Sequence, residues 1–164
     1  MTDPVIFTSV LRRVVNLFNR FTAIYPNDVS IWKEYINFCI RCKNFRALSR
    51  ATGRALQLHP RQQELWLIAA YIEKDLKKDF DGARSVLQKA VGMNTDSIKL
   101  WQEYFKFECQ MCVMSEHEEV KNGNVARVVF SHALKNLPNP NRRTFKVIAE
   151  ECNAPESVIS MLDE

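Results

Sequence analysis

Apolar side chains recur at steps of three and four residues through most of the chain, which is the spacing of one face of an α-helix. Prolines and chain-stopping residues interrupt this pattern, notably at Pro26, Pro60 and Pro138. The helices predicted between these breaks cover residues 4–25, 29–43, 45–58, 61–78, 80–92, 97–115, 124–137, 141–152 and 155–163. The pattern therefore predicts an all-α fold of about ten helices.

Three tryptophans give the helical pattern a period. Trp32, Trp66 and Trp101 stand 34 and 35 residues apart, and an apolar residue precedes each of them. A fixed period of this length is typical of stacked pairs of helices. We therefore predict one α-solenoid over residues 1–164. Its predicted parts are a half repeat at 4–26, repeats at 27–60, 61–95 and 96–138, and C-terminal helices at 141–163.

Particular residue types also mark the ends of these helices and the faces where they contact one another. An aspartate precedes three predicted helices, where its carboxylate can cap the free backbone N–H groups; these are Asp28, Asp79 and Asp96. Alanines occupy matching positions in the second helices of the repeats, namely Ala55, Ala90 and Ala133, with Ala83 and Ala126 seven residues earlier in two of them. Small side chains let helices approach closely, so we predict that these alanines lie in helix–helix contacts.

The repeats share a set of residues, of which each repeat carries a part. The first helix has a Trp, an aromatic residue three positions later and a Glu seven positions later, whereas the second has an Ala-Arg pair and ends at a Pro. The residues that fit are Trp32, Tyr35 and Pro60; Trp66, Glu73 and Arg84; and Trp101, Tyr104, Glu108, Arg127 and Pro138. This set resembles the half-a-TPR (HAT) repeat over roughly residues 8–140. The resemblance implies an α-solenoid of antiparallel helix pairs.

The first repeat departs from the motif at two positions. Cys39 stands where the Glu is expected, and Ser49 stands where the Arg is expected. Removal of one partner of a buried ion pair leaves a charge without compensation, at a cost of about 3–5 kcal/mol, so a joint loss suggests that the two residues interact. We therefore predict ion pairs across the two helices of one repeat. The predicted pairs are Glu73 with Arg84 and Glu108 with Arg127.

The HAT resemblance carries functional expectations, because HAT repeats occur almost wholly in RNA-processing assemblies. Residues 31–39, 65–73 and 99–108 are most similar to HAT proteins of the UTP-B complex in the small-subunit processome. This implies a non-enzymatic scaffold in the nucleolus, with β-propeller subunits as partners, contact with pre-rRNA or small nucleolar RNA, and a role in 18S rRNA maturation. Members of that group are longer at both ends.

Two other functions remain open at this stage. One is a HAT scaffold of pre-mRNA splicing or 3′-end processing. The other is a TPR-like adaptor that captures peptide tails. Such an adaptor needs a clamp of Lys, Arg and Asn for a carboxylate, and the spacings in this sequence do not assemble one.

Charge is unevenly distributed along the chain. The net charge is +4, but residues 1–60 carry nine basic and three acidic side chains, which leaves −2 for the remainder. Five basic residues concentrate at the end of the first helix and along the second helix of the first repeat: Arg41, Lys43, Arg46, Arg50 and Arg54. The three at four-residue steps share one helix face. This row is either a solvated surface or a contact for RNA phosphates or an acidic subunit.

The cysteines and the stretch around His117 are the remaining candidates for chemistry. The pairs Cys39/Cys42 and Cys109/Cys112 have zinc-ligand spacing, but they lie 66 residues apart, and packing as small buried hydrophobes is favoured. The acidic stretch around His117, at residues 116–119, is expected to be an exposed loop or a helix extension. We find no nucleophile triad, phosphate-binding glycine loop, signal peptide or long apolar run. The sequence therefore predicts no catalytic residue, cofactor, metal, small-molecule substrate or membrane contact.

Overall fold

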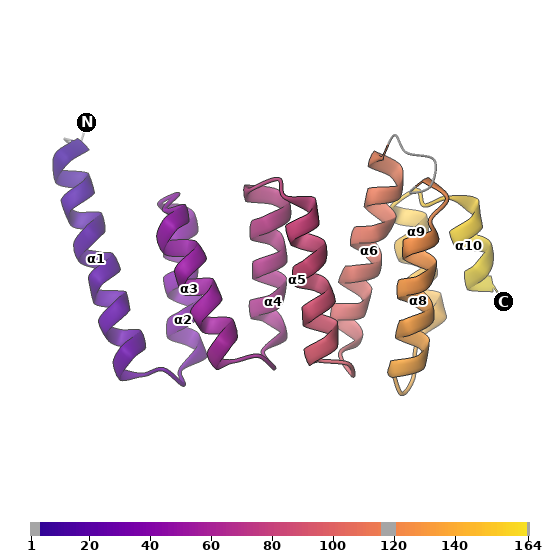
Figure 1. The fold of residues 1–164 in the computed structure, drawn as a ribbon, viewed down its shortest axis with the longest axis horizontal. Helices are drawn as coiled ribbons and strands as arrows, with labels where there is room; N and C mark the ends of the chain where they lie inside the picture. Colours follow the sequence, from indigo (N-terminus) through magenta and orange to yellow (C-terminus); the bar gives the residue numbers. More distant parts are fainter. Residues whose placement is uncertain (1–3, 116–120, 164) are drawn as a thin grey trace. The chain divides into compact units, whose positions relative to one another are not determined.

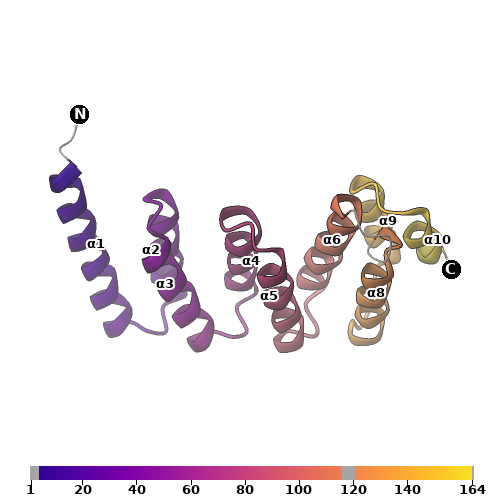
Figure 2. The same cartoon turned by 45° about the horizontal axis from the view of Figure 1, so that its top comes forward.

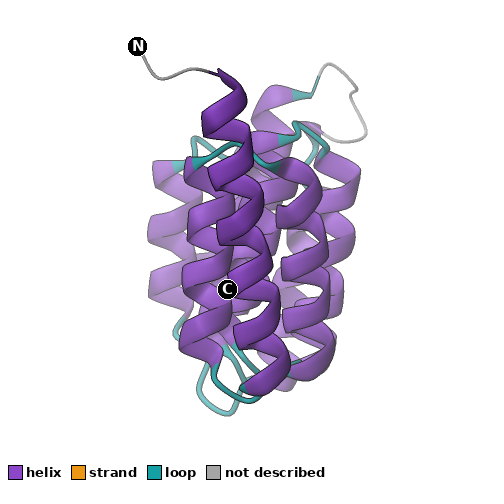
Figure 3. Cartoon of the chain, turned by 90° about the vertical axis from the view of Figure 1, so that its left-hand side faces the viewer, coloured by secondary structure: helices purple, strands orange, loops and turns teal. Residues whose placement is uncertain are grey.

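The computed structural model describes residues 4–115 and 121–163. The chain divides into two compact units, residues 1–65 and 66–164. Nine α-helices and one π-helical segment lie within the described residues, joined by short loops and without strands (Figures 1 and 3). The all-α fold class expected from the hydrophobic pattern is confirmed.

The first unit is built on three helices and the start of a fourth. They are α1 (Pro4–Ile24), α2 (Val29–Arg41), α3 (Phe45–Leu58) and the first residues of α4 (Gln63–Tyr71). The carboxylate of Asp28 accepts a hydrogen bond from the Ser30 backbone N–H at 2.9 Å, so its predicted role as the cap of α2 is confirmed. α2 packs against both α1 and α3, which places it at the centre of this unit (Figure 1).

The core of the first unit gathers around the inner face of α2. The buried residues of α2 and α3 are Trp32, Tyr35, Ile36 and Cys39, with Ala47, Leu48, Ala51, Thr52 and Ala55. From α1, the ring of Phe18 stacks on Tyr35 with centroids 4.9 Å apart, and Thr22 is buried. The apolar stripe predicted for α1 is covered only in part, because Val10, Leu17, Phe21 and Ile24 remain about half exposed.

The second unit continues from α4. Its further elements are the π-helical segment Ile72–Leu76, α5 (Phe80–Met93), α6 (Ile98–Met114), α8 (Asn124–Asn136), α9 (Arg142–Glu151) and α10 (Glu156–Asp163). The helix predicted over 61–78 is thus divided at Tyr71, where the hydrogen-bond register changes from α to π. α6 packs against α5, α8 and α9, and α10 pairs with α9 beside α8 (Figure 2).

Of the two helix caps predicted in the second unit, the structure confirms one and contradicts the other. Asp79 accepts a hydrogen bond from the Gly82 N–H at 2.8 Å, so its prediction as the cap of α5 is confirmed. The prediction for Asp96 is wrong, because Ser97 caps α6 and its hydroxyl accepts from the Leu100 N–H at 3.3 Å. The reason is positional: α6 begins at Ile98, so Ser97 occupies the N-cap position and Asp96 lies one residue outside it.

Aromatic rings and alanines fill the core of the second unit. The rings of Phe105, Phe130 and Phe145 lie 5.2–6.0 Å apart and join α6, α8 and α9. The alanines predicted at helix contacts in the two units are Ala55, Ala83, Ala90, Ala126 and Ala133, and all are completely buried. Their prediction is confirmed, and it follows from the close approach that a methyl side chain allows.

Candidate interaction surfaces and the repeat motif

Two of the motif tryptophans, Trp32 and Trp101, anchor the loop that leads into their own helix. Trp32 Nε1 donates to the carbonyl oxygen of Pro26 at 2.9 Å, and His59 Nε2 donates to the same oxygen at 2.8 Å. Trp101 Nε1 donates to the carbonyl oxygen of Thr95 at 2.8 Å, again six residues earlier. All three tryptophans, Trp66 included, are buried. The motif Trp therefore stabilises the repeat and is not a platform for a ligand.

The other uncharged motif residues also serve packing. The Tyr35 hydroxyl donates to Asn19 Oδ1 at 3.0 Å, which ties α2 to α1. Burial is the main cause that raises the pKa values of Tyr35 and Tyr104 above their usual value. Pro60 and Pro138 follow the last turns of α3 and α8, where a residue without an N–H cannot continue the helix.

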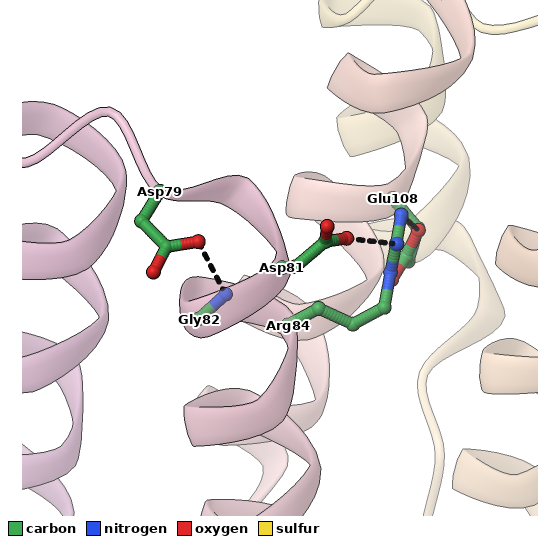
Figure 4. Close-up of polar contacts among 5 residues, drawn as sticks. All are labelled: Asp79, Asp81, Gly82, Arg84 and Glu108. Atoms are coloured by element: carbon green, nitrogen blue, oxygen red, sulfur yellow. Dashed lines mark hydrogen bonds and ion pairs between the residues drawn. The ribbon is translucent and has the colours of Figure 1, made fainter.

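The charged motif residues form one ion pair with two parallel hydrogen bonds. Arg84 on α5 donates from Nε to Glu108 Oε1 at 2.7 Å and from Nη2 to Oε2 at 3.0 Å (Figure 4). The Glu108 side chain is 1% exposed, while that of Arg84 is 30% exposed. The guanidinium also lies 5.8 Å from the ring centroid of Phe107 and 3.5 Å from Asp81. The hydrogen bonds to Glu108 are the main cause that raises the pKa of Arg84.

The predicted ion pairs within single repeats are therefore wrong. Arg84 follows the second Trp whereas Glu108 follows the third, so the pair joins consecutive repeats. Glu73 accepts a hydrogen bond from Lys77 at 2.7 Å instead. Arg127 is exposed and forms no ion pair with any described residue.

The register of the real pair assigns the two departures of the first repeat, Cys39 and Ser49, to different pairs. Arg84 precedes Glu108 by 24 residues, and Ser49 precedes Glu73 by the same number. At that spacing Glu73 has no arginine, which accounts for its pairing with a lysine one turn away on its own helix. The pair thus joins the second helix of one repeat to the first helix of the next.

The basic residues singled out from the sequence all lie on the surface of the first unit. We define the α3 basic surface as Arg41, Lys43, Arg46, Arg50 and Arg54, each of which is exposed. Lys43 sits in the left-handed turn between α2 and α3, with φ of 52°. On α3, the arginines at four-residue steps lie opposite the buried face of the helix. The structure therefore brings the turn and the helix face into one positively charged surface.

Acidic groups are scarce around this surface. No Asp or Glu occurs from residue 35 to residue 63, and residues 1–65 carry ten basic and four acidic side chains, a net charge of +6. Within the described residues none of the five cations forms an ion pair. An exposed, uncompensated row of guanidinium groups suits phosphates or carboxylates of a partner.

The cysteines behave as core residues. Cys39, Cys109 and Cys112 are buried free thiols, as predicted, and Cys42 and Cys152 are half-buried. Burial raises the pKa of Cys39 to about 11, and it also raises the pKa values of Cys109 and Cys112. Across residues 4–115 and 121–163 no three His, Cys, Asp or Glu side chains are arranged to hold a metal ion. The acidic stretch with His117 lies outside the described residues.

Among the described helices, none has the length and hydropathy needed to span a bilayer. Sequence reasoning overlooked a groove in the second unit, to which Lys74 and Lys106 both contribute. These two lysines are 32 residues apart. Lys74 lies eight positions after Trp66 and Lys106 five positions after Trp101, so the repeat period does not relate one to the other.

Comparison with known proteins identifies the family. The family model described as "Suppressor of forked protein (Suf)" matches residues 7–141. The chain belongs to the Suf family. This confirms the HAT-repeat resemblance and agrees with the helical repeat fold observed here.

The chain is similar to two kinds of protein, U3 small nucleolar RNA-associated proteins and mRNA 3′-end-processing proteins. The chain is 28% identical over 116 residues to U3 small nucleolar RNA-associated protein 6 of Schizosaccharomyces pombe, covering 70% of the chain and 24% of the relative. The homolog from Dictyostelium discoideum is 35% identical over 104 residues, covering 61% and 16%. The mRNA 3′-end-processing protein RNA14 of Gibberella zeae is 31% identical over 110 residues, covering 60% and 11%. The chain thus spans a quarter or less of the length of these relatives.

Proposed function

We propose that this Suf-family chain is a non-enzymatic scaffold of a ribosome-biogenesis particle, the small-subunit processome, and that it supports 18S rRNA maturation in the nucleolus. Its repeats would be residues 27–60, 61–95 and 96–138, stacked as one solenoid. The observation that carries the proposal is the similarity of the repeat segment to U3 small nucleolar RNA-associated proteins of a yeast and an amoeba. Their name associates those relatives with U3 small nucleolar RNA.

A scaffold role agrees with how the polar groups of the motif are used. The Arg84 guanidinium and the Glu108 carboxylate satisfy each other, and the Tyr35 hydroxyl donates to Asn19. These groups therefore hold helices together and are not free to act on a substrate. Repeat proteins of this kind function by presenting extended surfaces to partners.

The α3 basic surface is the part that we assign to binding. Its five exposed cations would contact phosphates of pre-rRNA or small nucleolar RNA, or the acidic surface of a neighbouring subunit such as a β-propeller of the UTP-B complex. The three tryptophans and two of the four tyrosines, Tyr35 and Tyr104, are buried, so these rings are not available to stack on bases. Contact through the RNA backbone, without base readout, is the mode that this surface supports.

The test is a crosslinked purification from cells, in which both proteins and RNA are identified. The wild-type chain is compared with Arg46→Glu/Arg50→Glu/Arg54→Glu and with a control, Lys89→Glu/Lys99→Glu/Lys135→Glu. The control residues are also exposed cations, and they lie on α5, α6 and α8. We expect U3 RNA, 18S precursors and β-propeller subunits with the wild type and the control, and a clear loss of RNA or subunits with the α3 variant.

A second function is favoured by one observation, the similarity to the 3′-end-processing protein of Gibberella zeae. The same purification distinguishes the two. Recovery of cleavage and polyadenylation factors in place of U3 RNA would retain the scaffold role and overturn the assignment to ribosome assembly.

A further inference from the structure

A continuous groove runs across the second unit between α4 with its π-helical segment on one side and α6 on the other. It consists of two adjoining hollows of about 270 and 370 Å³. Lys74, Asp75 and Gln110 line both hollows, which makes them one feature, and we call it the α4–α6 groove. None of its lining residues belongs to the α3 basic surface.

The π-helical segment helps to shape this groove. Residues Ile72–Leu76 follow α4 directly and contain Lys74 and Asp75, which face both hollows. Lys74 Nζ donates to Gln110 Oε1 of α6 at 3.3 Å, so a single hydrogen bond crosses the groove where the hollows meet. A π turn is rare, and it occurs frequently at functional sites because it reorients a few side chains of an otherwise regular helix.

The lining combines an apolar floor with charged edges. The first hollow has Leu67, Ala70, Leu87 and Phe107 below the half-exposed ring of Tyr71. The second ends at Phe80, Met111, Val113 and Met114, of which Val113 is 53% and Met114 is 64% exposed. Flexible methionine side chains adapt to varied apolar ligands. The floor therefore suits large aliphatic or aromatic side chains.

The charged residues that line the groove indicate which ligands it can bind. The groove contains three lysines, Lys74, Lys78 and Lys106, against Asp75 and Glu103. Asp75 lies 3.8 Å from Lys74, whereas Lys78 and Lys106 form no ion pair with a described residue. Two lysines are thus available for carboxylates. The acidic groups would repel a continuous phosphate backbone, which disfavours RNA at this site.

We propose that the α4–α6 groove binds a peptide segment of a partner protein, in which acidic residues flank a large apolar side chain. The apolar side chain would occupy the floor, and the carboxylates would pair with Lys106 and Lys78. Volumes of this size hold a few side chains of a bound segment. The proposal goes beyond the scaffold assignment and uses different residues, so its failure would leave the α3 basic surface unaffected.

The experiment is selection of a random 12-residue peptide library on the whole chain, followed by anisotropy titration of labelled synthetic peptides. The variants are Lys106→Glu in the first hollow and Met114→Glu in the second; Met114 is so exposed that folding does not depend on it. Lys89→Glu on α5 is the control, because Lys89 is an exposed lysine outside the groove. Far-ultraviolet circular dichroism checks that each variant is folded.

We expect enriched peptides in which Asp or Glu neighbours Leu, Phe or Trp. Their Kd should rise about tenfold or more with Lys106→Glu and with Met114→Glu, and change less than about twofold with Lys89→Glu. Absence of enrichment, enrichment of basic peptides, or equal binding to the groove variants would each overturn the proposal. It would also be overturned by groove variants that abolish self-association of the chain in sedimentation velocity, because the occupant would then be a second copy.

Discussion

Arg84 on α5 encloses the carboxylate of Glu108 on α6 with two hydrogen bonds of 2.7 and 3.0 Å. The carboxylate is almost completely buried, and the guanidinium that compensates it is partly open to solvent. A buried charge of this kind depends on its partner, because the alternative is a charge in a poorly solvated core. The pair therefore links two successive repeats and makes their register specific.

The first prediction concerns the loss of this arginine. Arg84→Ala should lower the free energy of unfolding by about 3–5 kcal/mol, because it leaves the Glu108 carboxylate buried and unpaired. Arg84→Met/Glu108→Leu should recover most of that loss, since no charge then remains in the core. Urea unfolding followed by circular dichroism measures both. The control is Arg127→Ala, at the matching motif position but exposed, which should change stability by less than about 0.5 kcal/mol. Equal effects at the two arginines would contradict this account of the motif.

The second prediction concerns salt dependence at the α3 basic surface. If Arg50 contacts a phosphate, Arg50→Ala should weaken binding to single-stranded RNA and reduce the slope of log K against log salt by about 0.7. Anisotropy titrations between about 50 and 200 mM salt provide the slope. Lys89→Ala, on the exposed side of α5, should leave the slope unchanged. An RNA affinity that does not respond to Arg50→Ala would indicate that this surface meets protein or solvent.

The third prediction concerns the stability of the chain in alkali. Burial raises the pKa of the Cys39 thiol from its ordinary value of 9.0 to about 11. Above pH 9 the unfolded chain releases this proton while the folded chain retains it, so the free energy of unfolding should fall as the pH rises from about 9 to about 11. Below pH 9 this thiol should contribute no pH dependence.

The matching variant for this titration is Cys39→Ala, studied with reductant present. Its decline in stability over the same pH interval should be shallower than that of the wild type, with the remaining slope due to the other buried thiols and tyrosines whose pKa values are also raised. Identical slopes for the two proteins would mean that Cys39 ionises normally when folded.

The fourth prediction compares two glycines. Gly123, before α8, has φ of 69°, and a Cβ added there would lie 2.2 Å from Val158 Cγ2 of α10. Gly123→Ala should therefore destabilise the chain by about 1–3 kcal/mol. Gly53, inside α3, has open space around its Cα, and Gly53→Ala should stabilise the chain by about 0.5–1 kcal/mol. Thermal unfolding of the two variants should give shifts of opposite sign, and a shared sign would contradict the local geometry at one of them.

The hydrophobic pattern predicted most of the helices with small errors at their ends. Asp28 and Asp79 were correct caps because capping depends on a few neighbouring residues. The sequence predicted Asp96 as the cap, whereas Ser97 is the cap. Both residue types cap helices well, and the sequence does not show at which residue the helix begins. The π turn after Tyr71 was also missed, because no local composition marks a change of hydrogen-bond register.

Of the candidate sites, one could be predicted from the sequence and the others could not. The α3 basic surface was visible in the sequence, because a row of arginines at four-residue steps on one helix needs no tertiary information. The partner of Arg84 was not, because spacing alone allowed both Glu73 and Glu108. The α4–α6 groove was also invisible, since its two sides come from helices separated by a third helix and two turns.

By itself, the sequence determined the helical fold, the 34- and 35-residue period, the buried faces and the charge difference between the two parts of the chain. These properties depend on residues a few positions apart on one helix, where 3.6 residues per turn sets the geometry. Only the tertiary structure decided which charges meet, how Lys74 reaches Gln110, and which part of the α1 stripe stays exposed. Such contacts join residues from different helices. Several residues have suitable chemistry for each contact, and the rotation and offset of the packed helices determine which of them meet.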